Sequence, residues 1–505
     1  MVTHRIIRLA VFSLFVQGTI FCQPSQDNIM VGNIDRLVDK MFAIDMTPGL
    51  AVCIVKGNVL LYAKGFGFAD VENRRPVTTE TLFYIASTTK SFTGLAATLL
   101  HHSGKIHFDS SMHYYLPSVR LQPPLSPDSI SVRALLTHTH GIQNDGPVVF
   151  RTAFSGEYTK TQLLELLVKH KPSPTGRFFS YGNLGYNIAG FVMEEATHAS
   201  WKDLVRQQVF EPLGMTSTRA SLSGIDEKRL AMPYAALGTG YQRLPYSKSD
   251  ANMHAAGGHV STVLDLAKWF IVQINMGKVG GKQVFPANVV AETHAIQAIQ
   301  DRNFAMFHRF GWGIGWDLGT YEGDTLIHRF GSFPGFRSHV SFMPQYNIGV
   351  AILVNESSLG SFLCDVVASS IYDELLQKAE RGKKLAATLA GLEENARKGR
   401  IAIAEHMAAR AARPQTLPYP LTMYTGTFEN GELGKMKWLV VDGRLEARIG
   451  LARSSVEVYN GQENKFRVEL TGGGEIVAFM IQEGKVSGLT YSGREFTRKV
   501  NSSKD

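Results

Sequence analysis

The stretch FYIASTTKSF, residues 83–92, places a serine three positions before a lysine where an extended, aromatic segment becomes helical. From Thr88 the apolar residues recur every three or four positions, and Gly104 follows as a stop signal. Residues three apart on a helix share one face, so the side chains of Ser87 and Lys90 can touch. The stretch predicts an amphipathic helix that begins either with a nucleophile and its base or with two unrelated polar residues.

A serine–lysine pair has definite chemical requirements. A serine hydroxyl is a weak nucleophile, and a lysine can activate it only when the amine is neutral at the working pH. Burial and the positive end of the helix dipole both disfavour the ammonium form. Lowering a lysine pKa from about 10.4 to about 7 costs roughly 4–5 kcal/mol. The pair alone does not distinguish the two alternatives, so further motifs are needed.

Two motifs further along the chain supply partners for such a pair. In RFFSYGNLGYNIAGF, residues 177–191, Tyr181 and Asn183 precede an amphipathic helix. A tyrosine can relay a proton, and an asparagine can hold a substrate amide while it hydrogen-bonds the lysine. In IHRFGSFPGF, residues 327–336, a cation precedes a Gly-Ser pair on a predicted strand. A backbone N–H of this strand and that of Ser87 would form an oxyanion hole.

The order Ser-x-x-Lys, Tyr-x-Asn, cation-x-Gly resembles the serine β-lactamase/penicillin-binding-protein superfamily, and most closely its class C-like branch of esterases and D-stereospecific peptidases. The resemblance covers residues 30–375 and rests on these blocks: IASTTKSFTGLAATLLHHSGKI, LLTHTHGI, FSYGNLGYNIAG, FEPLGMTST, GGHVSTVLDLAKW and GSFPGFRSHVSFMP. It implies an α+β fold (an α/β sandwich), in which an antiparallel sheet is flanked by helices and carries an inserted all-helical subdomain, as in DD-peptidases and β-lactamases.

The resemblance also implies a role for each matching residue. Ser87 would be the acylated nucleophile, Lys90 its base and Tyr181 the second proton-transfer residue. Asn183 would bind the acyl amide, and the main-chain N–H groups of Ser87 and Ser332 would form the oxyanion hole. No Glu-x-x-x-Asn block lies between the first two motifs. Deacylation would therefore depend on a water molecule activated by Tyr181 or Lys90.

The third motif departs from the family pattern. Aligned without a gap on GSFPGF, the cation position falls on Arg329, where relatives have lysine or histidine, and His328 one residue earlier faces the other side of the strand. Arg329 cannot transfer a proton, so it would anchor a substrate carboxylate or keep Lys90 neutral. In a third alternative Arg329 points away and His328 fills the site through a bulge. The candidate substrate-binding residues here are Arg329, His328, Gly331 and Ser332.

Other classes of protein are weighed against this one. An α/β-hydrolase needs a Gly-x-Ser-x-Gly elbow, and the chain contains none. A zinc hydrolase would use His138-Thr139-His140, but the following Asp-His and a third ligand group are missing. We expect His140 to be a structural loop residue, and we expect no metal and no cofactor.

The expected function is that of a serine hydrolase that forms an acyl-enzyme on amide or ester bonds. The substrate would be a D-amino-acid peptide, a β-lactam or a short ester, and the motifs do not choose among these. The alternative is a catalytically silent peptide-binding or cell-wall-binding protein on the same fold. The intact Ser87, Lys90, Tyr181 and Asn183 argue against that alternative.

Four segments are expected along the chain: a signal peptide (1–22), a catalytic domain (23–378), a helical linker (379–414) and an all-β, barrel-like domain (415–499). The last looks like the lipocalin-like accessory domain of some family members. Within the catalytic domain the pattern predicts a hairpin over 49–70 and strands at 311–318, 337–343 and 348–355. The simplest assembly pairs these late strands with the early hairpin.

The N-terminus predicts export. A short basic region, residues 1–8, precedes the mostly apolar residues 9–22, a run too short to span a membrane. We expect a Sec-type signal peptide cleaved after Cys22 and a periplasmic or extracellular protein. A lipoprotein anchored at Cys22 is the less favoured alternative, because Phe21 is large where such signals want a small residue. No later run is long enough for an integral membrane segment.

The composition indicates a globular protein with a mild positive charge. Hydrophobic residues make up 44% of the 505 residues and charged residues 19%. Removal of Arg5 and Arg8 with the signal peptide would lower the formal net charge of +8 by two. The excess is scattered, so we expect a small-molecule or peptide substrate and no nucleic acid. Cys53 and Cys364 stand in apolar runs and read as buried thiols rather than a disulfide. The oligomeric state is not predicted.

Overall fold

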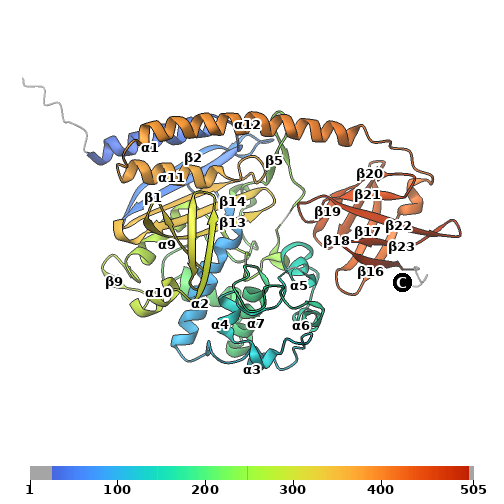
Figure 1. The fold of residues 1–505 in the computed structure, drawn as a ribbon, viewed down its shortest axis with the longest axis horizontal. Helices are drawn as coiled ribbons and strands as arrows, with labels where there is room; N and C mark the ends of the chain where they lie inside the picture. The colour runs from blue at the N-terminus through green and yellow to red at the C-terminus, as the bar shows by residue number, and fades with distance from the viewer. Residues whose placement is uncertain (1–25, 145, 247, 500–505) are drawn as a thin grey trace, which may run out of the picture.

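The computed structural model describes residues 26–144, 146–246 and 248–499. The predicted signal peptide, residues 1–22, therefore lies outside the described residues. Figure 1 shows a large unit, in which helices cover both faces of a central sheet, and a smaller C-terminal sheet. A long helix, α12 (Arg381–Ala411), runs across the large unit toward the smaller one. This arrangement confirms the expected fold class, whereas the domain boundaries stay predictions.

The central sheet has nine strands and is antiparallel throughout. In spatial order they are β10 (Ala298–Phe304), β11 (Phe307–Trp312), β12 (Asp317–Tyr321), β13 (Asp324–Phe333), β14 (Phe336–Met343), β15 (Ile348–Val354), β1 (Gly49–Lys56), β2 (Val59–Asp70) and β3 (Arg75–Pro76). The hairpin turn lies at Gly57, whose φ is +60°. Cys53 of β1 pairs with Ala351 of β15, so the early hairpin and the late strands do close one sheet, as expected.

One predicted strand is wrong. The sequence predicts a single strand over 311–318, but β11 ends at Trp312 and β12 begins at Asp317. Gly315 between them has a φ of +88°, and a Cβ at this position would lie 2.5 Å from the carbonyl oxygen of Lys90. The chain leaves the sheet here to pack closely against the nucleophile helix.

Successive residues of β1 alternate between two apolar cores, as expected for a strand buried on both faces. One core contains Leu50, Val52 and Ile54, and the other contains Ala51, Cys53 and Val55. The first core is covered by α1 (Gln26–Phe42), α11 (Leu363–Leu375) and part of α12. Only Leu392 and Ala396 of α12 are buried, so the rest of this helix is partly or fully exposed to solvent.

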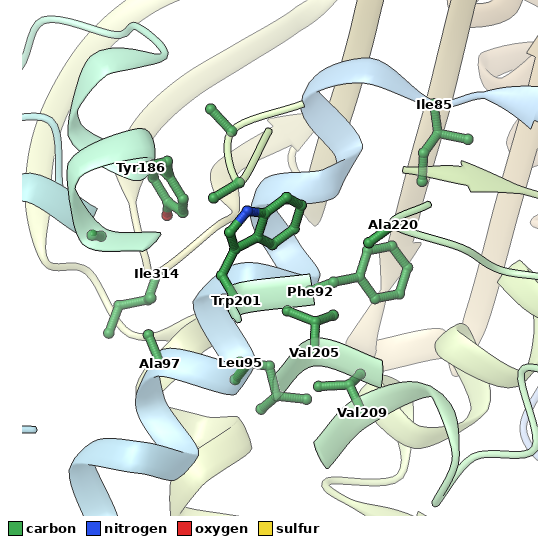
Figure 2. Close-up of a cluster of buried hydrophobic side chains, with 14 of the residues drawn as sticks. Ile85, Phe92, Leu95, Ala97, Tyr186, Trp201, Val205, Val209, Ala220 and Ile314 are labelled. Carbon is green, nitrogen blue, oxygen red and sulfur yellow. The ribbon is translucent and has the colours of Figure 1, made fainter. Parts of the chain in front are cut away.

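The second core holds the helix that carries the predicted base. Phe92 and Leu95 of α2 (Thr89–His102) lie beside Trp201 and Val205, and Ala97 lies beside Ile314 (Figure 2). The other helices on this side are α3 (Met112–Tyr115), α4 (Val132–Leu136), α5 (Pro147–Phe150), α6 (Lys160–Leu166), α7 (Leu184–Thr197), α8 (Trp201–Val205), α9 (Val263–Ile274) and α10 (Ala287–His294). Short strand pairs join β4 (Phe83–Tyr84) to β7 (Val260–Ser261), β5 (Tyr234–Ala236) to β6 (Tyr241–Arg243), and β8 (Lys278–Val279) to β9 (Lys282–Gln283).

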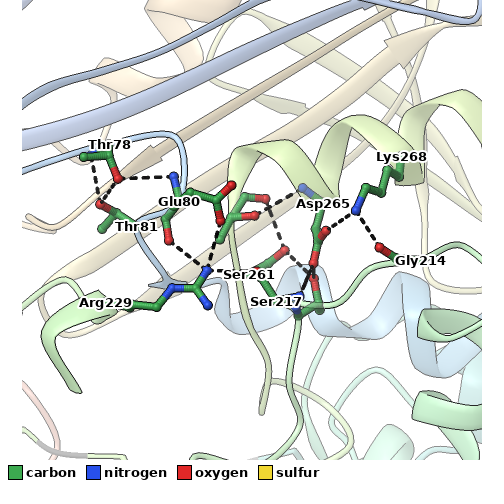
Figure 3. Close-up of polar contacts among 11 residues, drawn as sticks. Thr78, Glu80, Thr81, Gly214, Ser217, Arg229, Ser261, Asp265 and Lys268 are labelled. Atoms are coloured by element: carbon green, nitrogen blue, oxygen red, sulfur yellow. Dashed lines mark hydrogen bonds and ion pairs between the residues drawn. The ribbon is translucent and has the colours of Figure 1, made fainter. Parts of the chain in front are cut away.

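A buried carboxylate fixes the strand pair that leads into the nucleophile. Asp265 is only 2% exposed and accepts hydrogen bonds from the backbone N–H groups of Ser217 and Thr218. The Thr218 hydroxyl also bonds Asp265 and the hydroxyl of Ser261 on β7 (Figure 3). Because β7 pairs with β4, this network holds the backbone just before Ser87.

The C-terminal sheet has nine antiparallel strands and is barrel-like, as expected. In spatial order they are β19 (Ala452–Ser455), β18 (Arg444–Ile449), β17 (Gly434–Val441), β16 (Gly426–Asn430), β24 (Arg494–Arg498), β23 (Lys485–Tyr491), β22 (Glu475–Gln482), β21 (Lys465–Val468) and β20 (Glu457–Asn460). Its core is built on Trp438, Phe466 and Phe479, whose rings meet edge to face.

Two further expectations concern thiols and membrane helices. Cys53 and Cys364 are both buried free thiols, which confirms the first. Burial raises the pKa of the Cys53 thiol to about 12, so it is not a reactive thiolate at neutral pH. Among the described residues, no helix has the length and apolar character to cross a membrane.

Candidate active site

Ser87 lies in a short turn of helix, η1 (Ala86–Thr88), that runs directly into α2. Ala86 just before it has a φ of +45°, which is unfavourable for a residue with a Cβ. Three contacts hold this turn: Ile85 N–H donates to the carbonyl of His259 over 3.0 Å, and the Thr88 and Ser338 hydroxyls lie 2.9 Å apart. The Ser338 hydroxyl also donates to the Ile85 carbonyl over 3.0 Å. The fold thus imposes the strained turn that presents Ser87 while Thr88 is buried.

Lys90 is fully buried one turn after Ser87. Its Nζ lies 3.2 Å from Ser87 Oγ, 2.8 Å from Asn183 Oδ1 and 2.8 Å from the carbonyl oxygen of Ala256. None of these partners carries a negative charge. Burial lowers the pKa of Lys90 to about 8, with a further contribution from the positive charge of Arg329, while Tyr181 opposes the shift. A neutral lysine is therefore accessible near neutral pH.

Tyr181 stands just before α7 with its ring 5.0 Å from Lys90 Nζ. Its hydroxyl accepts a hydrogen bond of 2.9 Å from Arg329. Burial alone would raise the pKa of Tyr181, but the positive charges of Arg329 and Lys90 outweigh it and lower the pKa to about 8. Both proton-transfer candidates are thus tuned toward the same pH range.

Arg329 points into the site from β13. One guanidinium nitrogen lies 2.6 Å from the buried carboxylate of Asp317, and another donates to Tyr181. The remaining contacts of 3.0 and 3.2 Å go to the carbonyl of Phe330. With its donors engaged inside the protein and 4% of its surface exposed, Arg329 is arranged to tune Lys90 and Tyr181 rather than to grip a substrate carboxylate.

His328 is not brought to the site. It is fully buried and its ring lies 4.4 Å from that of Phe330 and 5.7 Å from that of Phe307, within the core on the other face of the sheet. In the described part of the chain neither ring nitrogen has a hydrogen-bond partner. The structure thus corrects the inclusion of His328 among the substrate-binding candidates, because alternation along β13 turns its side chain inward.

Gly331 explains why β13 can pass so close to the nucleophile. A Cβ on Gly331 would lie 2.1 Å from the carbonyl oxygen of Ile85, so only glycine fits there. Ser332 follows and is exposed. This contact brings the end of β13 against η1, and the pairing of the Ser87 and Ser332 N–H groups as an oxyanion hole stays a prediction.

The two candidate zinc histidines have other surroundings. His138 is buried with a φ of +60°, and its ring lies 4.8 Å from Tyr181 and 4.6 Å from Trp312. His140 Nδ1 accepts a hydrogen bond from the backbone of Ile142, which fits the expected loop role. Within the residues described, no group of three or more His, Cys, Asp or Glu side chains is placed to hold a metal ion.

Several contributors to the site were not predicted. Ala256 acts through its carbonyl, which leaves no mark in the sequence. Asp317 is an isolated carboxylate whose partner, Arg329, only the sheet pairing reveals. Asn144 fills the space beside Gly182, where a Cβ would lie 2.0 Å from its Oδ1, and its Nδ2 donates to the carbonyl of Ser180 over 2.9 Å. Asn144 lies two residues after the block LLTHTHGI, and this proximity to a family block is the sequence feature that could have indicated its place near the site.

A serine at the start of a helix, a buried lysine one turn later, a Tyr-x-Asn loop and an antiparallel sheet strand alongside define the class of the serine β-lactamases and penicillin-binding proteins. Residues 34–364 match the family model described as Beta-lactamase. The chain therefore belongs to this family, which confirms the expected resemblance.

Similar proteins agree with this assignment. "Protein flp" of Staphylococcus aureus (strain COL) is 25% identical over 331 residues, which cover 64% of this chain and 63% of that protein. The penicillin-binding protein homologue from Pyrococcus abyssi, described as octameric, has a TM-score of 0.58 at 23% identity and covers 93% of this chain and 100% of its own. The D-amino acid amidase from Ochrobactrum anthropi SV3 has a TM-score of 0.59 at 22% identity, and the match covers 70% of this chain and 99% of the amidase chain. The chain thus spans less than two thirds of the length of the first curated relatives that it matches, and these structures support the fold.

Proposed function

We propose that this member of the Beta-lactamase family is a serine hydrolase that forms an acyl-enzyme on Ser87 and acts on amide or ester bonds. The observation that carries the proposal is the contact of 3.2 Å between Ser87 Oγ and Lys90 Nζ, a buried amine whose hydrogen-bond partners among the described residues are all uncharged. A catalytically silent binding protein would have no need of a desolvated lysine beside a partly exposed serine.

In the acylation step, neutral Lys90 takes the proton of the Ser87 hydroxyl as Oγ attacks the substrate carbonyl carbon. The oxyanion that forms is stabilised by the main-chain N–H groups of Ser87 and Ser332. The bond to the leaving amine or alcohol then breaks, and the leaving group receives a proton from Tyr181 or Lys90. Asn183, held by Lys90 at 2.8 Å, orients the acyl group.

In the deacylation step, water attacks the acyl carbon and loses a proton to Tyr181 or Lys90. The acid product then leaves, and Ser87 regains its proton. The pKa values of about 8 on both side chains support this cycle, because each group can accept and return a proton near neutral pH.

The substrate class we propose is a D-amino-acid peptide or amide, a β-lactam or a short ester. One protein that shares the fold is named a D-amino acid amidase, and another is named a penicillin-binding protein homologue. We further propose that the chain is exported through its N-terminal segment, which lies outside the described residues.

A substrate panel with trapping of the intermediate tests the proposal. The purified protein is incubated separately with a D-amino acid amide, a p-nitrophenyl ester and nitrocefin. Each reaction is quenched and analysed by intact-protein mass spectrometry. We expect turnover of at least one compound and a mass increase equal to its acyl group. Ser87→Ala should lose both, while Ser91→Ala, a matched change one turn further along α2, should keep both. Reversible binding of these compounds without turnover or adduct would instead favour a silent binding protein.

A further inference from the structure

A cavity of about 450 Å³ lies between the helical subdomain and the C-terminal sheet. Phe150, Phe154, Lys169 and Lys171 line it from the helical side, and Tyr491 and Arg494 are among the residues that line it from the sheet. Its volume is within the range of sites that hold small organic molecules. Neither the sequence motifs nor the proposed chemistry accounts for it.

The two walls of the cavity are held together by specific contacts. Arg151 is 8% exposed and donates hydrogen bonds across to the backbone carbonyls of Glu432, over 2.6 Å, and Gly431, over 3.3 Å. The backbone N–H of Leu451 donates to the carbonyl of Ser155 over 2.9 Å. Since these bonds fix the sheet on the helical subdomain, the cavity is a built feature rather than a gap between loosely tethered units.

One wall of the cavity is also a wall of the active site. The ring of Phe154 stacks on that of Phe333, with centroids 5.7 Å apart, and Phe333 directly follows Ser332. Gln143 lines the cavity, and its neighbour Asn144 packs against Gly182 beside Asn183. The cavity therefore adjoins the side of the site where Asn183 is expected to receive the acyl group.

The cavity combines aromatic surface with unpaired positive charge. Lys169 and Lys171 are exposed, and in the described part of the chain neither ammonium group is in an ion pair or hydrogen bond. Glu475 accepts a hydrogen bond from Tyr491, and Arg494 is paired with Glu432. The Tyr491 hydrogen bond does not neutralise the Glu475 carboxylate. Among the described residues, the unpaired charges at the cavity are therefore two lysines and one carboxylate, and their net positive charge favours an anionic group.

We propose that this cavity is a remote subsite that binds the distal carboxylate of an acidic acyl chain while its scissile bond lies at Ser87. The aromatic rings hold the apolar part of the chain, and Lys169 and Lys171 bind the carboxylate. Arg329 cannot serve as this anchor because its donors are engaged by Asp317, Tyr181 and Phe330. This proposal rests on the proposed hydrolase function, and it specifies the preferred substrate as one whose acyl chain ends in a carboxylate.

The test uses p-nitrophenyl monoesters of α,ω-dicarboxylic acids of increasing length and the matching monocarboxylic esters, which share one leaving group. At the best chain length, Lys169→Gln/Lys171→Gln should raise KM for the diacid monoester about tenfold or more. KM for the monocarboxylic ester and kcat for both should stay within about twofold. The matched control is Lys278→Gln/Lys282→Gln, an exposed lysine pair on the β8–β9 hairpin.

A second arm separates this proposal from the proposed function. Calorimetry with the same monoesters on Ser87→Ala measures binding without chemistry. The proposal predicts tighter binding of the diacid monoester than of its neutral counterpart, and loss of that preference in the Ser87→Ala protein that also carries the two lysine changes. An unchanged preference, or an equal loss in the control pair, overturns the subsite. Turnover that persists in Ser87→Ala would instead overturn the proposed function and leave the binding result valid.

Discussion

Ser87 and Ser341 are each hydrogen-bonded to a lysine or histidine side chain, a group that can act as a base, and they lie on opposite faces of the central sheet. Ser87 meets Lys90 at the start of α2. Ser341 on β14 meets His339 Nε2 at 2.7 Å, and His339 Nδ1 meets Asp365 at 2.8 Å. The second group has the bonding order of a Ser-His-Asp triad, yet all three of its side chains are fully buried.

The difference between the two groups is one of access and charge. The Ser341 hydroxyl has a second partner, the hydroxyl of Tyr372 at 2.9 Å, and α11 covers the group. Burial lowers the pKa of His339 while Asp365 opposes the shift, which favours a neutral imidazole at neutral pH. The charge in this group is that of the Asp365 carboxylate, which is paired with Arg337 at 3.2 Å. Among the described residues Lys90 has no carboxylate as a hydrogen-bond partner, and Ser87 is partly exposed. A hydroxyl beside a base becomes a nucleophile only where substrate can reach it.

The largest expected effect distinguishes the two serines directly. Ser87→Ala should lower kcat/KM at least about a thousandfold with little change in Tm, because it removes the nucleophile and almost no packing. Ser341→Ala should keep kcat/KM within about threefold but lose about 1–3 kcal/mol of unfolding free energy, since His339 loses a buried partner. Steady-state kinetics and urea unfolding check both. The reverse pattern would place the chemistry at Ser341.

A second comparison uses Tyr181, which lies near Lys90, and Tyr372, which is hydrogen-bonded to Ser341. Tyr181→Phe should lower kcat about a hundredfold, and it should slow deacylation at least as much as acylation because it removes a proton-transfer group. Tyr372→Phe should leave kcat unchanged and cost about 1 kcal/mol of stability. Rapid-quench measurement of the acyl-enzyme separates the two steps. Failure to trap any intermediate in Tyr181→Phe would count against its role in deacylation.

Arg329 should set the pH range over which Ser87, Lys90 and Tyr181 are active. Burial lowers the pKa of Lys90 to about 8 with a further contribution from the positive charge of Arg329, and the same charge is the largest cause that lowers the pKa of Tyr181 to about 8 against the effect of burial. Removal of Arg329 should therefore raise both pKa values. In Arg329→Met the acidic limb of the kcat/KM profile should move up by roughly one pH unit, with about a tenfold loss at neutral pH. Arg329→Lys should restore part of the shift. Arg329→Met leaves the buried Asp317 with the Gln300 amide at 3.0 Å and with Arg309 at 3.5 Å as its remaining cation, so Tm is measured alongside.

The smallest expected effect on activity concerns His328. Burial holds its pKa well below 6.5, so the folded state resists protonation and this residue lowers stability as the pH falls below about 6.5. His328→Leu should leave kcat/KM within about twofold and reduce the loss of Tm between pH 7 and pH 5. A drop in kcat/KM comparable to that of Arg329→Met would mean that His328, not Arg329, fills the cation position.

The parts of the molecule that the sequence predicts are those with a local signal. The apolar spacing after Thr88 predicts α2, and the Lys56-Gly57-Asn58 turn predicts the first hairpin. Ser87, Lys90 and Asn183 converge because helix periodicity and motif order reflect contacts that the family fold requires.

The rest depends on contacts between distant segments. The break at Gly315 arises from close packing on Lys90, which no local pattern records. The ion pair of Asp317 with Arg329 exists because the sheet brings them together. The buried Ser341 group likewise joins β14 to α11, and its residues have no distinctive spacing along the chain.

Labelling with a fluorophosphonate, followed by peptide mapping, tests the central claim most directly. The reagent reacts with an activated serine hydroxyl that solvent can reach. It therefore distinguishes Ser87 from the buried Ser341 without any assumption about the substrate. We predict a single adduct on Ser87, lost in Ser87→Ala and retained in Ser341→Ala. An adduct on another serine, or no adduct in a preparation that turns over substrate, would contradict covalent catalysis by Ser87.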